Sequence, residues 1–346
     1  MDKMVYQYTR FCDKMINNII AIVCILFAFF GTLFLIKKWI FVAKNINLVG
    51  KDMNKYNKPS VAEGGGIVIM IAVVFSIMLY IFFKTFLLGN ETNMINIFSV
   101  LLTIMLAGFI GFMDDVLGWL KGIRQKTKVL LTVSIAFPLV IVNAGHSIIN
   151  IPILGLVDFG ILYPLLIIPI GIIGAANGYN MLAGYNGLEA GLGVIIVGTL
   201  TCISFLNGYL WLTMIGMIAV SSLIAFLLFN WYPAKIFPGD SLTYMIGALI
   251  AAMAIMGNMQ TIAVVLFIPF ICDLILTSRS KFKAVAFAKV NKDNSLTLPY
   301  KKIYDLTHLV IFLLSKVKKK VYEQDVVITI IGFEFLLTII SVIFLV

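Results

Sequence analysis

Two adjacent carboxylates, Asp114 and Asp115, are the first candidates for chemistry in this chain. They lie in the sequence Gly-Phe-Met-Asp-Asp-Val-Leu-Gly, at the end of a long apolar stretch. Neighbouring carboxylates repel each other unless a proton, a cation or a basic group balances them. Side chains adjacent on a helix point about 100° apart, so one could face a site while the other orients it. The alternative is a solvated helix end, although two Asp residues are unfavourable at a helix C-terminus.

A second candidate segment, from Asn177 to Gly191, is rich in carboxamides and glycines and contains no Lys or Arg. Asn177 and Asn180 are three residues apart, which places them on one face of a helix. Their oxygens would suit a hard cation or a Mg²⁺ bound to a pyrophosphate. The glycines allow the backbone to approach a ligand closely. The alternative is an ordinary tight turn between two helices.

A third carboxylate, Asp240, follows Phe-Pro-Gly and precedes another apolar stretch. A carboxylate at that point can be an ordinary N-cap. Next to a Pro-Gly turn and Lys235 it could instead stand at the mouth of a membrane site.

Basic residues follow two of the apolar stretches. Arg124, Lys126 and Lys128 follow the stretch near 95–112, and Arg279, Lys281 and Lys283 follow the stretch near 260–277. These side chains could bind phosphates, or they could only contact lipid headgroups.

These candidate groups belong to a very apolar chain. Of its 346 residues, 61% are hydrophobic and 12% are charged, and its mean hydropathy is +1.06. A soluble domain is about 45–50% apolar and about 25% charged. The composition therefore excludes a soluble enzyme, a secreted disulfide scaffold and a disordered tail. The four cysteines show no C-x-x-C spacing and are interpreted as small core residues.

The elements that must position these groups are membrane helices, each needing about 20 apolar residues. Ten stretches meet this requirement, near 18–36, 65–83, 95–112, 129–145, 161–177, 190–206, 209–229, 241–256, 260–277 and 326–345. The first is too long for a signal peptide and lacks a cleavage site. The sequence therefore predicts an all-α polytopic membrane protein with about ten transmembrane helices, forming one domain over 1–346.

The basic residues predict an orientation for these helices. The loops after the odd-numbered spans hold 22 of the 26 Lys and Arg residues. Positively charged loops face the cytoplasm. We therefore expect the candidate site loops to be cytoplasmic and both termini to be outside. The net charge of +10 is then topological and does not indicate nucleic-acid binding.

Two loops have features of their own. Alternating residues in 146–160 predict a small extracytoplasmic hairpin. The cytoplasmic loop 278–325 contains an apolar run from Leu306 that ends in lysines at Lys320, which predicts a helix in the membrane interface.

Acidic and amide groups for a divalent metal, with basic groups for phosphates, meet at one predicted membrane face. This combination indicates phosphoryl transfer involving a lipid. A transporter of anionic lipids, the rival class, would place polar groups at the bilayer midplane. The sequence shows no internal repeat and has Glu334 as its clearest mid-span polar residue.

Over residues 50–283 the chain resembles the polyprenyl-phosphate N-acetylhexosamine-1-phosphate transferases, and most closely their dolichyl-phosphate branch. The resemblance rests on five segments, which are Lys51-Asp-Met-Asn-Lys55, Glu63-Gly-Gly, Phe112-Met-Asp-Asp-Val-Leu117, Asn177 to Gly191, and Asn230 to Asp240. Bacterial members usually have Asp-Gly where this chain has Ala183-Gly184, which favours the dolichyl branch over the cell-wall branch.

The resemblance implies roles for individual residues. Asn180 and Asp240 would hold Mg²⁺, or Mn²⁺, on the donor pyrophosphate, and Asp114, Asp115 and Lys126 would be catalytic. The implied substrate-binding residues are Asn54, Glu63, Asn177, Tyr185, Asn186, Gly187, Arg279, Lys281 and Lys283. The chain departs from the family in the last three positions, because no histidine accompanies them.

The implied reaction is attack by a lipid phosphate on the β-phosphorus of a UDP-N-acetylhexosamine, most simply UDP-GlcNAc, with release of UMP. The acceptor would be a polyprenyl or dolichyl phosphate. Such a phosphate is largely ionised near neutral pH, so direct displacement is favoured over an aspartyl intermediate. The host membrane would be the cell membrane or the endoplasmic reticulum, and a homodimer is left open. A cell-wall-precursor transferase is the alternative within the family.

Overall fold

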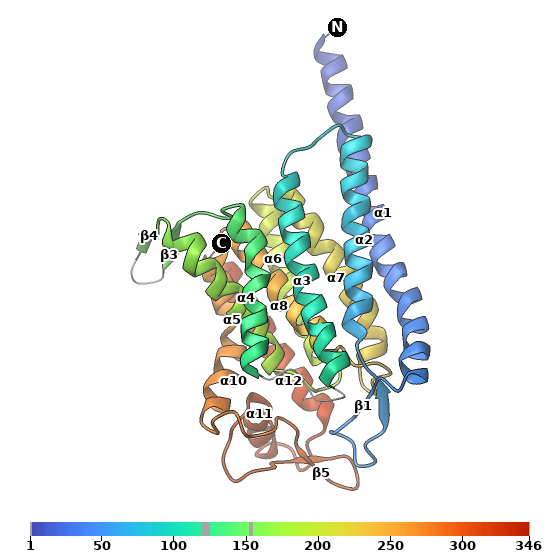
Figure 1. Cartoon of the computed structure of the whole chain (residues 1–346), viewed down its shortest axis with the longest axis vertical. Coiled ribbons are helices and arrows are strands. Elements are labelled where there is room, and N and C mark those ends of the chain that lie inside the picture. Colours follow the sequence, from blue (N-terminus) through green and yellow to red (C-terminus); the bar gives the residue numbers. More distant parts are fainter. Residues whose placement is uncertain (1, 119–124, 152–154, 346) are drawn as a thin grey trace.

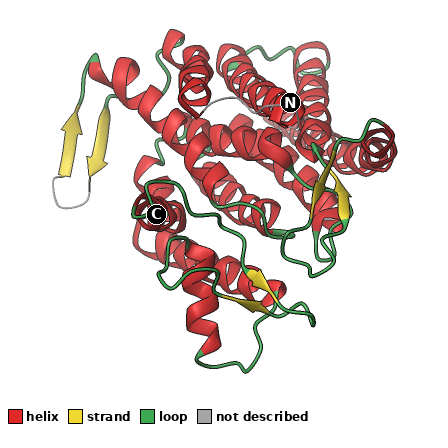
Figure 2. Ribbon diagram, turned by 60° about the horizontal axis from the view of Figure 1, so that its bottom comes forward, coloured by secondary structure: helices red, strands yellow, loops and turns green. Residues whose placement is uncertain are grey.

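The structure is a computed structural model that describes residues 2–118, 125–151 and 155–345. The described chain forms a helical bundle with three short two-stranded sheets at its periphery (Figures 1 and 2). In a bilayer core the backbone must satisfy its own hydrogen bonds, and helices do so within one segment.

Twelve α-helices and one π-helical turn make up the described bundle. They are α1 (Asp2–Asn45), α2 (Gly65–Phe86), α3 (Met94–Gly118), α4 (Gln125–Ile141), η1 (Tyr163–Ile167), α5 (Ile168–Met181), α6 (Leu188–Leu206), α7 (Leu210–Asn230), α8 (Gly239–Met256), α9 (Gln260–Leu266), α10 (Ile268–Ser278), α11 (Leu306–Ser315) and α12 (Glu323–Leu345).

The prediction of an all-α polytopic membrane protein is confirmed. Among the described residues, eight segments are long and apolar enough to cross a membrane, or nine if the bent pair α9 and α10 is one span. The pair is bent by 55°, and Pro269 at the start of α10 lacks the N–H that a continuous helix would use. The span predicted at 129–145 corresponds to α4, which has 17 residues. The predicted number of ten therefore stays unconfirmed.

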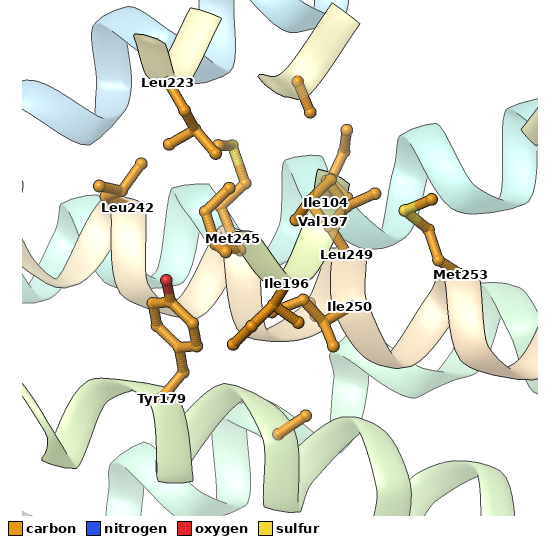
Figure 3. Close-up of a cluster of buried hydrophobic side chains, with 14 of the residues drawn as sticks. Ile104, Tyr179, Ile196, Val197, Leu223, Leu242, Met245, Leu249, Ile250 and Met253 are labelled. Atoms are coloured by element: carbon orange, nitrogen blue, oxygen red, sulfur yellow. The ribbon is translucent and has the colours of Figure 1, made fainter. Parts of the chain in front are cut away.

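Helix α8 forms the centre of the bundle. In the most apolar 18-residue stretch of α8, 89% of the residues are buried. In the corresponding stretch of α1, at the edge of the bundle, 28% are buried. Figure 3 shows Leu242, Met245 and Met253 of α8 among side chains of α3, α5, α6 and α7, which include Ile104, Tyr179, Ile196 and Leu223. A helix that is apolar all round is fixed by packing on every side. Its first turn, which carries Asp240, is therefore firmly placed.

One short sheet ties the chain before α2 to the chain before α8. Strands β1 (Val49–Lys51) and β2 (Ser60–Ala62) pair antiparallel, with Val49 opposite Ala62. Ala62 also forms a bridge with Ile236, just before α8. The backbone N–H of Phe237 donates to the carbonyl oxygen of Ala62 at 2.7 Å. Two segments far apart in sequence thus meet at the same end of the bundle.

The hairpin predicted in 146–160 is present, as β3 (Ile148–Ile151) pairs antiparallel with β4 (Gly155–Asp158). Figure 2 shows that it stands off to one side of the bundle. The helix predicted from Leu306 is α11, and it ends at Ser315, before the lysines. Helix α11 packs against α10 and α12 and buries residues such as His308 and Ile311.

The third sheet, β5 (Lys289–Val290) with β6 (Leu296–Thr297), lies in the segment between α10 and α11. In Figure 1 this segment, α11 and β1 occupy the lower end of the molecule, and the N-terminus is at the opposite end. The lower end is where the candidate polar residues gather.

Candidate active site

A pocket of about 510 Å³ opens at the end of the bundle where α5 ends and where α6 and α8 begin. Its wall carries four carboxylates and two lysines. The acidic residues are Asp52, Glu63, Glu189 and Asp240, and the basic residues are Lys51 and Lys128. A polar pocket at the end of an apolar bundle is the natural candidate for a binding site.

Lys128 of α4 joins two of the predicted carboxylates. Its Nζ donates to Oδ2 of Asp240 at 3.0 Å and forms an ion pair with Asp114. Burial alone would lower the pKa of Lys128, but the neighbouring Asp240 and Asp114 raise that pKa above its usual range. The ammonium group therefore stays charged, and it balances carboxylates contributed by two different helices, α3 and α8.

Asp115 lies next to this ion pair but binds backbone. Its two oxygens accept the N–H groups of Asp240 at 2.6 Å and of Ser241 at 3.1 Å. These N–H groups are in the first turn of α8, where a helix lacks internal partners and prefers negative charge. The geometry gives Asp115 a positioning role, because it fixes the turn that carries Asp240.

Gly111 allows α3 to approach α8 at this point. A Cβ built on Gly111 would lie 2.6 Å from the backbone nitrogen of Ser241, closer than real Cβ contacts. An added methyl group must therefore push α3 away from the first turn of α8.

We expect Gly111→Ala to destabilise the protein by about 1–3 kcal/mol, the usual cost of overpacking a tight contact. The measurement is the melting temperature of the purified protein in detergent. Gly118→Ala on the same helix is the matched control, because a Cβ there meets no described atom within 4 Å. Equal melting temperatures for the two variants would contradict the close helix contact.

Asn180, at the end of α5, faces the same pocket as Asp240. The Thr243 hydroxyl lies 2.7 Å from Oδ1 of Asn180 and 3.1 Å from the carbonyl oxygen of Asp240. This hydroxyl links the two residues that the sequence predicted as metal ligands.

The turn between α5 and α6 forms a second wall of the pocket. Tyr185 is buried, and Asn186 donates from Nδ2 to Oδ2 of Asp52 at 3.0 Å. Gly187 has φ +85°, and a side chain there would run into Trp231. Glycine is therefore required at this position.

Similarity to known proteins bears on the identity of this site. The family model described as "Glycosyl transferase family 4" matches residues 97–258. A protein of Saccharolobus solfataricus, provisionally named as a UDP-N-acetylglucosamine–dolichyl-phosphate N-acetylglucosaminephosphotransferase, is 39% identical over 306 residues, covering 87% of this chain and 89% of its own. A Sulfolobus acidocaldarius protein with the same provisional name is 35% identical over 310 residues, covering 89% and 91%. The chain belongs to glycosyl transferase family 4.

A bacterial protein is also similar to this family 4 chain. The phospho-N-acetylmuramoyl-pentapeptide-transferase of Halalkalibacterium halodurans is 31% identical over 211 residues, which cover 58% of this chain and 62% of its own. The similarity to the bacterial protein is thus less extensive than that to the two archaeal proteins.

The residues matched to family 4 include much of the pocket. The pocket residues Lys128, Asn180 and Asp240 all lie within 97–258, as does Asp114, which pairs with Lys128 from outside the pocket lining. Glu63 lies outside this range but lines the pocket, and burial together with the charge of Asp240 raises the pKa of Glu63.

Two predicted substrate residues of this family 4 chain lie behind the pocket wall. Asn54 is buried and donates from Nδ2 to the carbonyl oxygen of Gly184 at 3.1 Å. Asn177 donates to Thr132 Oγ1 at 3.2 Å and to the carbonyl oxygen of Ile173 at 2.8 Å. Neither residue is among those that line the pocket. The structure therefore gives them contacts that support the wall.

The predicted basic residues are distributed differently from the acidic ones. Arg279, Lys281 and Lys283 are exposed on the segment after α10 and do not line the pocket. The side chain of Lys126 lies outside the described residues. The sequence marks Lys128 only as one of three basic residues after the third predicted span, whereas the structure shows that Lys128 pairs with Asp114 and Asp240.

The sequence does not single out Glu323 as a site residue. It lies in the first turn of α12, 2% exposed, and accepts the backbone N–H of Asn186 at 2.8 Å. No local pattern marks it, since its partners lie more than 130 residues away in sequence.

Proposed function

We propose that this chain transfers N-acetylglucosamine 1-phosphate from UDP-N-acetylglucosamine to a dolichyl or related polyprenyl phosphate, releasing UMP. The observation that carries the proposal is the Asp114–Lys128–Asp240 cluster beside a polar pocket at one end of a membrane bundle. The names of the two archaeal relatives support the donor and acceptor.

In this reaction an oxygen of the lipid phosphate forms a bond to the β-phosphorus of the donor. The bond from that phosphorus to the oxygen it shares with the α-phosphate breaks, and UMP leaves with the electron pair. A phosphomonoester has a second pKa of about 6, so the attacking oxygen needs little help from a base. Lys128 balances phosphate charge, and Asp114 holds Lys128 in place.

The oxygen ligands that the pocket offers fit a magnesium ion that enters bound to the nucleotide-sugar. Magnesium is commonly bound by one or two protein groups together with substrate phosphates. Asp240 and Asn180 offer such a pair of hard oxygen ligands and are linked through Thr243. The described residues include no cluster of three His, Cys, Asp or Glu side chains suited to a metal, so phosphates would complete the coordination. When bound, the ion would neutralise pyrophosphate charge.

The test is to incubate purified protein with a polyprenyl phosphate, Mg²⁺ and a panel of UDP-sugars, and to measure UMP. We expect release with UDP-N-acetylglucosamine that depends on the lipid. Release only with a UDP-muramoyl-pentapeptide would identify the cell-wall alternative. Lipid movement across vesicles without UMP release would identify a transporter.

The orientation is a further part of the proposal. We propose that the pocket end faces the cytoplasm and both termini face outward, with α11 near the membrane surface, because the odd-numbered loops hold 22 of 26 basic residues. Arg279, Lys281 and Lys283 would then contact headgroups or incoming phosphates. The homodimer stays an untested prediction.

We expect cysteine introduced at Lys301, in a background without the native thiols, to resist an impermeant thiol reagent on intact cells. Lys301 is exposed at the pocket end of the molecule, so the reagent should label it only after permeabilisation. Cysteine at Asn90, an exposed residue in the predicted outer loop between α2 and α3, is the matched control and should react without permeabilisation. Rapid labelling of the Lys301 position from outside would reverse the orientation.

A further inference from the structure

A buried charge network ties the pocket wall to the first turn of α12. Oε1 of Glu323 accepts the backbone N–H of Asn186 at 2.8 Å, and Oε2 forms an ion pair with Lys55. The side chains of Lys55 and Glu323 are only 10% and 2% exposed. Burying two charges is costly unless each is paired and hydrogen-bonded, and the contacts of Glu323 and Lys55 meet this requirement.

Lys55 extends the network to the pocket. Its Nζ lies 3.2 Å from Oδ2 of Asp52 and 4.1 Å from the centre of the Tyr232 ring. The same Oδ2 of Asp52 accepts the Nδ2 group of Asn186 at 3.0 Å. Because a carboxylate only accepts hydrogen bonds, this contact fixes which end of the Asn186 amide faces Asp52.

The network has an inner and an outer layer. Asp52 and Asn186 line the pocket, whereas Lys55 and Glu323 do not. The outer pair therefore acts on a ligand only through the inner pair. The loop that carries Lys55 is held on both sides, since Asn54 binds Gly184 and the backbone N–H of Tyr56 donates to Asn294 at 2.8 Å.

We propose that Glu323 is a positioning residue which, together with Lys55, holds Asp52 and Asn186 in the arrangement that binds the nucleotide-sugar donor. This inference rests on the proposed function. Glu323 joins the backbone of one wall segment, at Asn186, to the side chain of another, at Lys55, and so sets the distance between them. Its carboxylate is held by both segments at once.

A purely structural role is the competing explanation, and the same helix offers a comparison. Asp325, two residues further on, pairs with Lys318 at 2.6 Å and accepts the backbone N–H of Tyr322 at 2.9 Å. That exposed pair already secures the start of α12. Replacing a buried ion pair by apolar side chains is often neutral for stability. The buried pair is therefore not required to dock the helix.

The network joins the loop between β1 and β2, the turn between α5 and α6, and α12, whereas the Asp114–Lys128–Asp240 cluster joins α3, α4 and α8. Asp115 holds the first turn of α8 independently of the network. Loss of the Glu323–Lys55 pair should therefore weaken donor binding and leave the chemical step nearly intact. We expect the KM for UDP-N-acetylglucosamine to rise about tenfold or more, with kcat within about threefold of the parent.

The experiment compares Glu323→Gln, the double variant Lys55→Met/Glu323→Met, and the control Asp325→Asn. Each is assayed for KM and kcat with the donor, for UDP binding by calorimetry, and for melting temperature. Glu323→Gln retains an acceptor for Asn186 but loses the charge opposite Lys55, so a smaller rise in KM is expected. The double variant removes both buried charges and should show the full rise at a melting temperature near the parent's. Asp325→Asn should keep the parent KM.

Parent-like KM and UDP affinity in the double variant would overturn the proposal, as would a fall in kcat at unchanged KM. If the double variant does not fold, the same outcomes in Glu323→Gln, a parent-like KM and UDP affinity or a fall in kcat at unchanged KM, would overturn the proposal. A parent protein that binds UDP but releases no UMP would count against the proposed function. UDP affinity would then still show whether Glu323 orders the pocket.

Discussion

Asp240→Asn should lose about 10²–10³-fold of its turnover while retaining the parent melting temperature. Asp240 joins the two halves of the site: its carboxylate binds Lys128, and its backbone carbonyl oxygen lies near the Thr243 hydroxyl that also contacts Asn180. The substitution preserves size and hydrogen bonding but removes the charge that would hold a metal ion on the pyrophosphate. Loss of one electrostatic stabiliser of a developing charge typically has an effect of this size.

The measurement is UMP release at saturating lipid over a range of Mg²⁺ concentrations. Asn180→Ala should behave similarly, because it removes the second oxygen ligand. Asp158→Asn, an exposed carboxylate in the β4 hairpin, is the matched control and should retain parent activity. Near-normal turnover of Asp240→Asn at ordinary Mg²⁺ would refute the metal assignment.

The membrane class and the positions of most helices could be predicted from sequence, because apolar runs of membrane length leave few alternatives. The predicted spans 65–83 and 241–256, for example, lie within α2 and α8. The span count was harder. Helix α4 is short. The helix is also interrupted at Phe267, between α9 and α10, and local hydropathy does not predict this interruption.

The site was predictable to the extent that its residues are clustered in sequence. Asp114 and Asp240 were found because each ends or begins an apolar run. The division of labour between Asp114 and Asp115 was not predictable, since it depends on where α3 meets α8, 125 residues later. Lys126 and Lys128 are two positions apart, hence about 200° around a helix. Only the position of α4 in the bundle shows that Lys128 faces the acidic pair.

Lys128→Met should reduce UMP release by about 10²–10³-fold, comparable to the loss expected for Asp240→Asn. Lys128 pairs with both Asp114 and Asp240. Methionine retains much of the length of the side chain but removes the ammonium group. The phosphates then lose a cation, and two nearby carboxylates lose the charge that balances them.

The loss of charge balance between Asp114 and Asp240 can be measured independently of turnover. Without Lys128, the two carboxylates repel each other, and a divalent cation should relieve that repulsion. The melting temperature of Lys128→Met should therefore be lowered without Mg²⁺ and should rise more on adding Mg²⁺ than that of the parent. Lys301→Met, an exposed lysine outside the pocket, is the matched control for both measurements. Lys126→Met tests the role inferred for that residue from sequence. If Lys128→Met keeps parent turnover and gains no extra stability from Mg²⁺, Lys128 serves neither the phosphates nor the acidic pair.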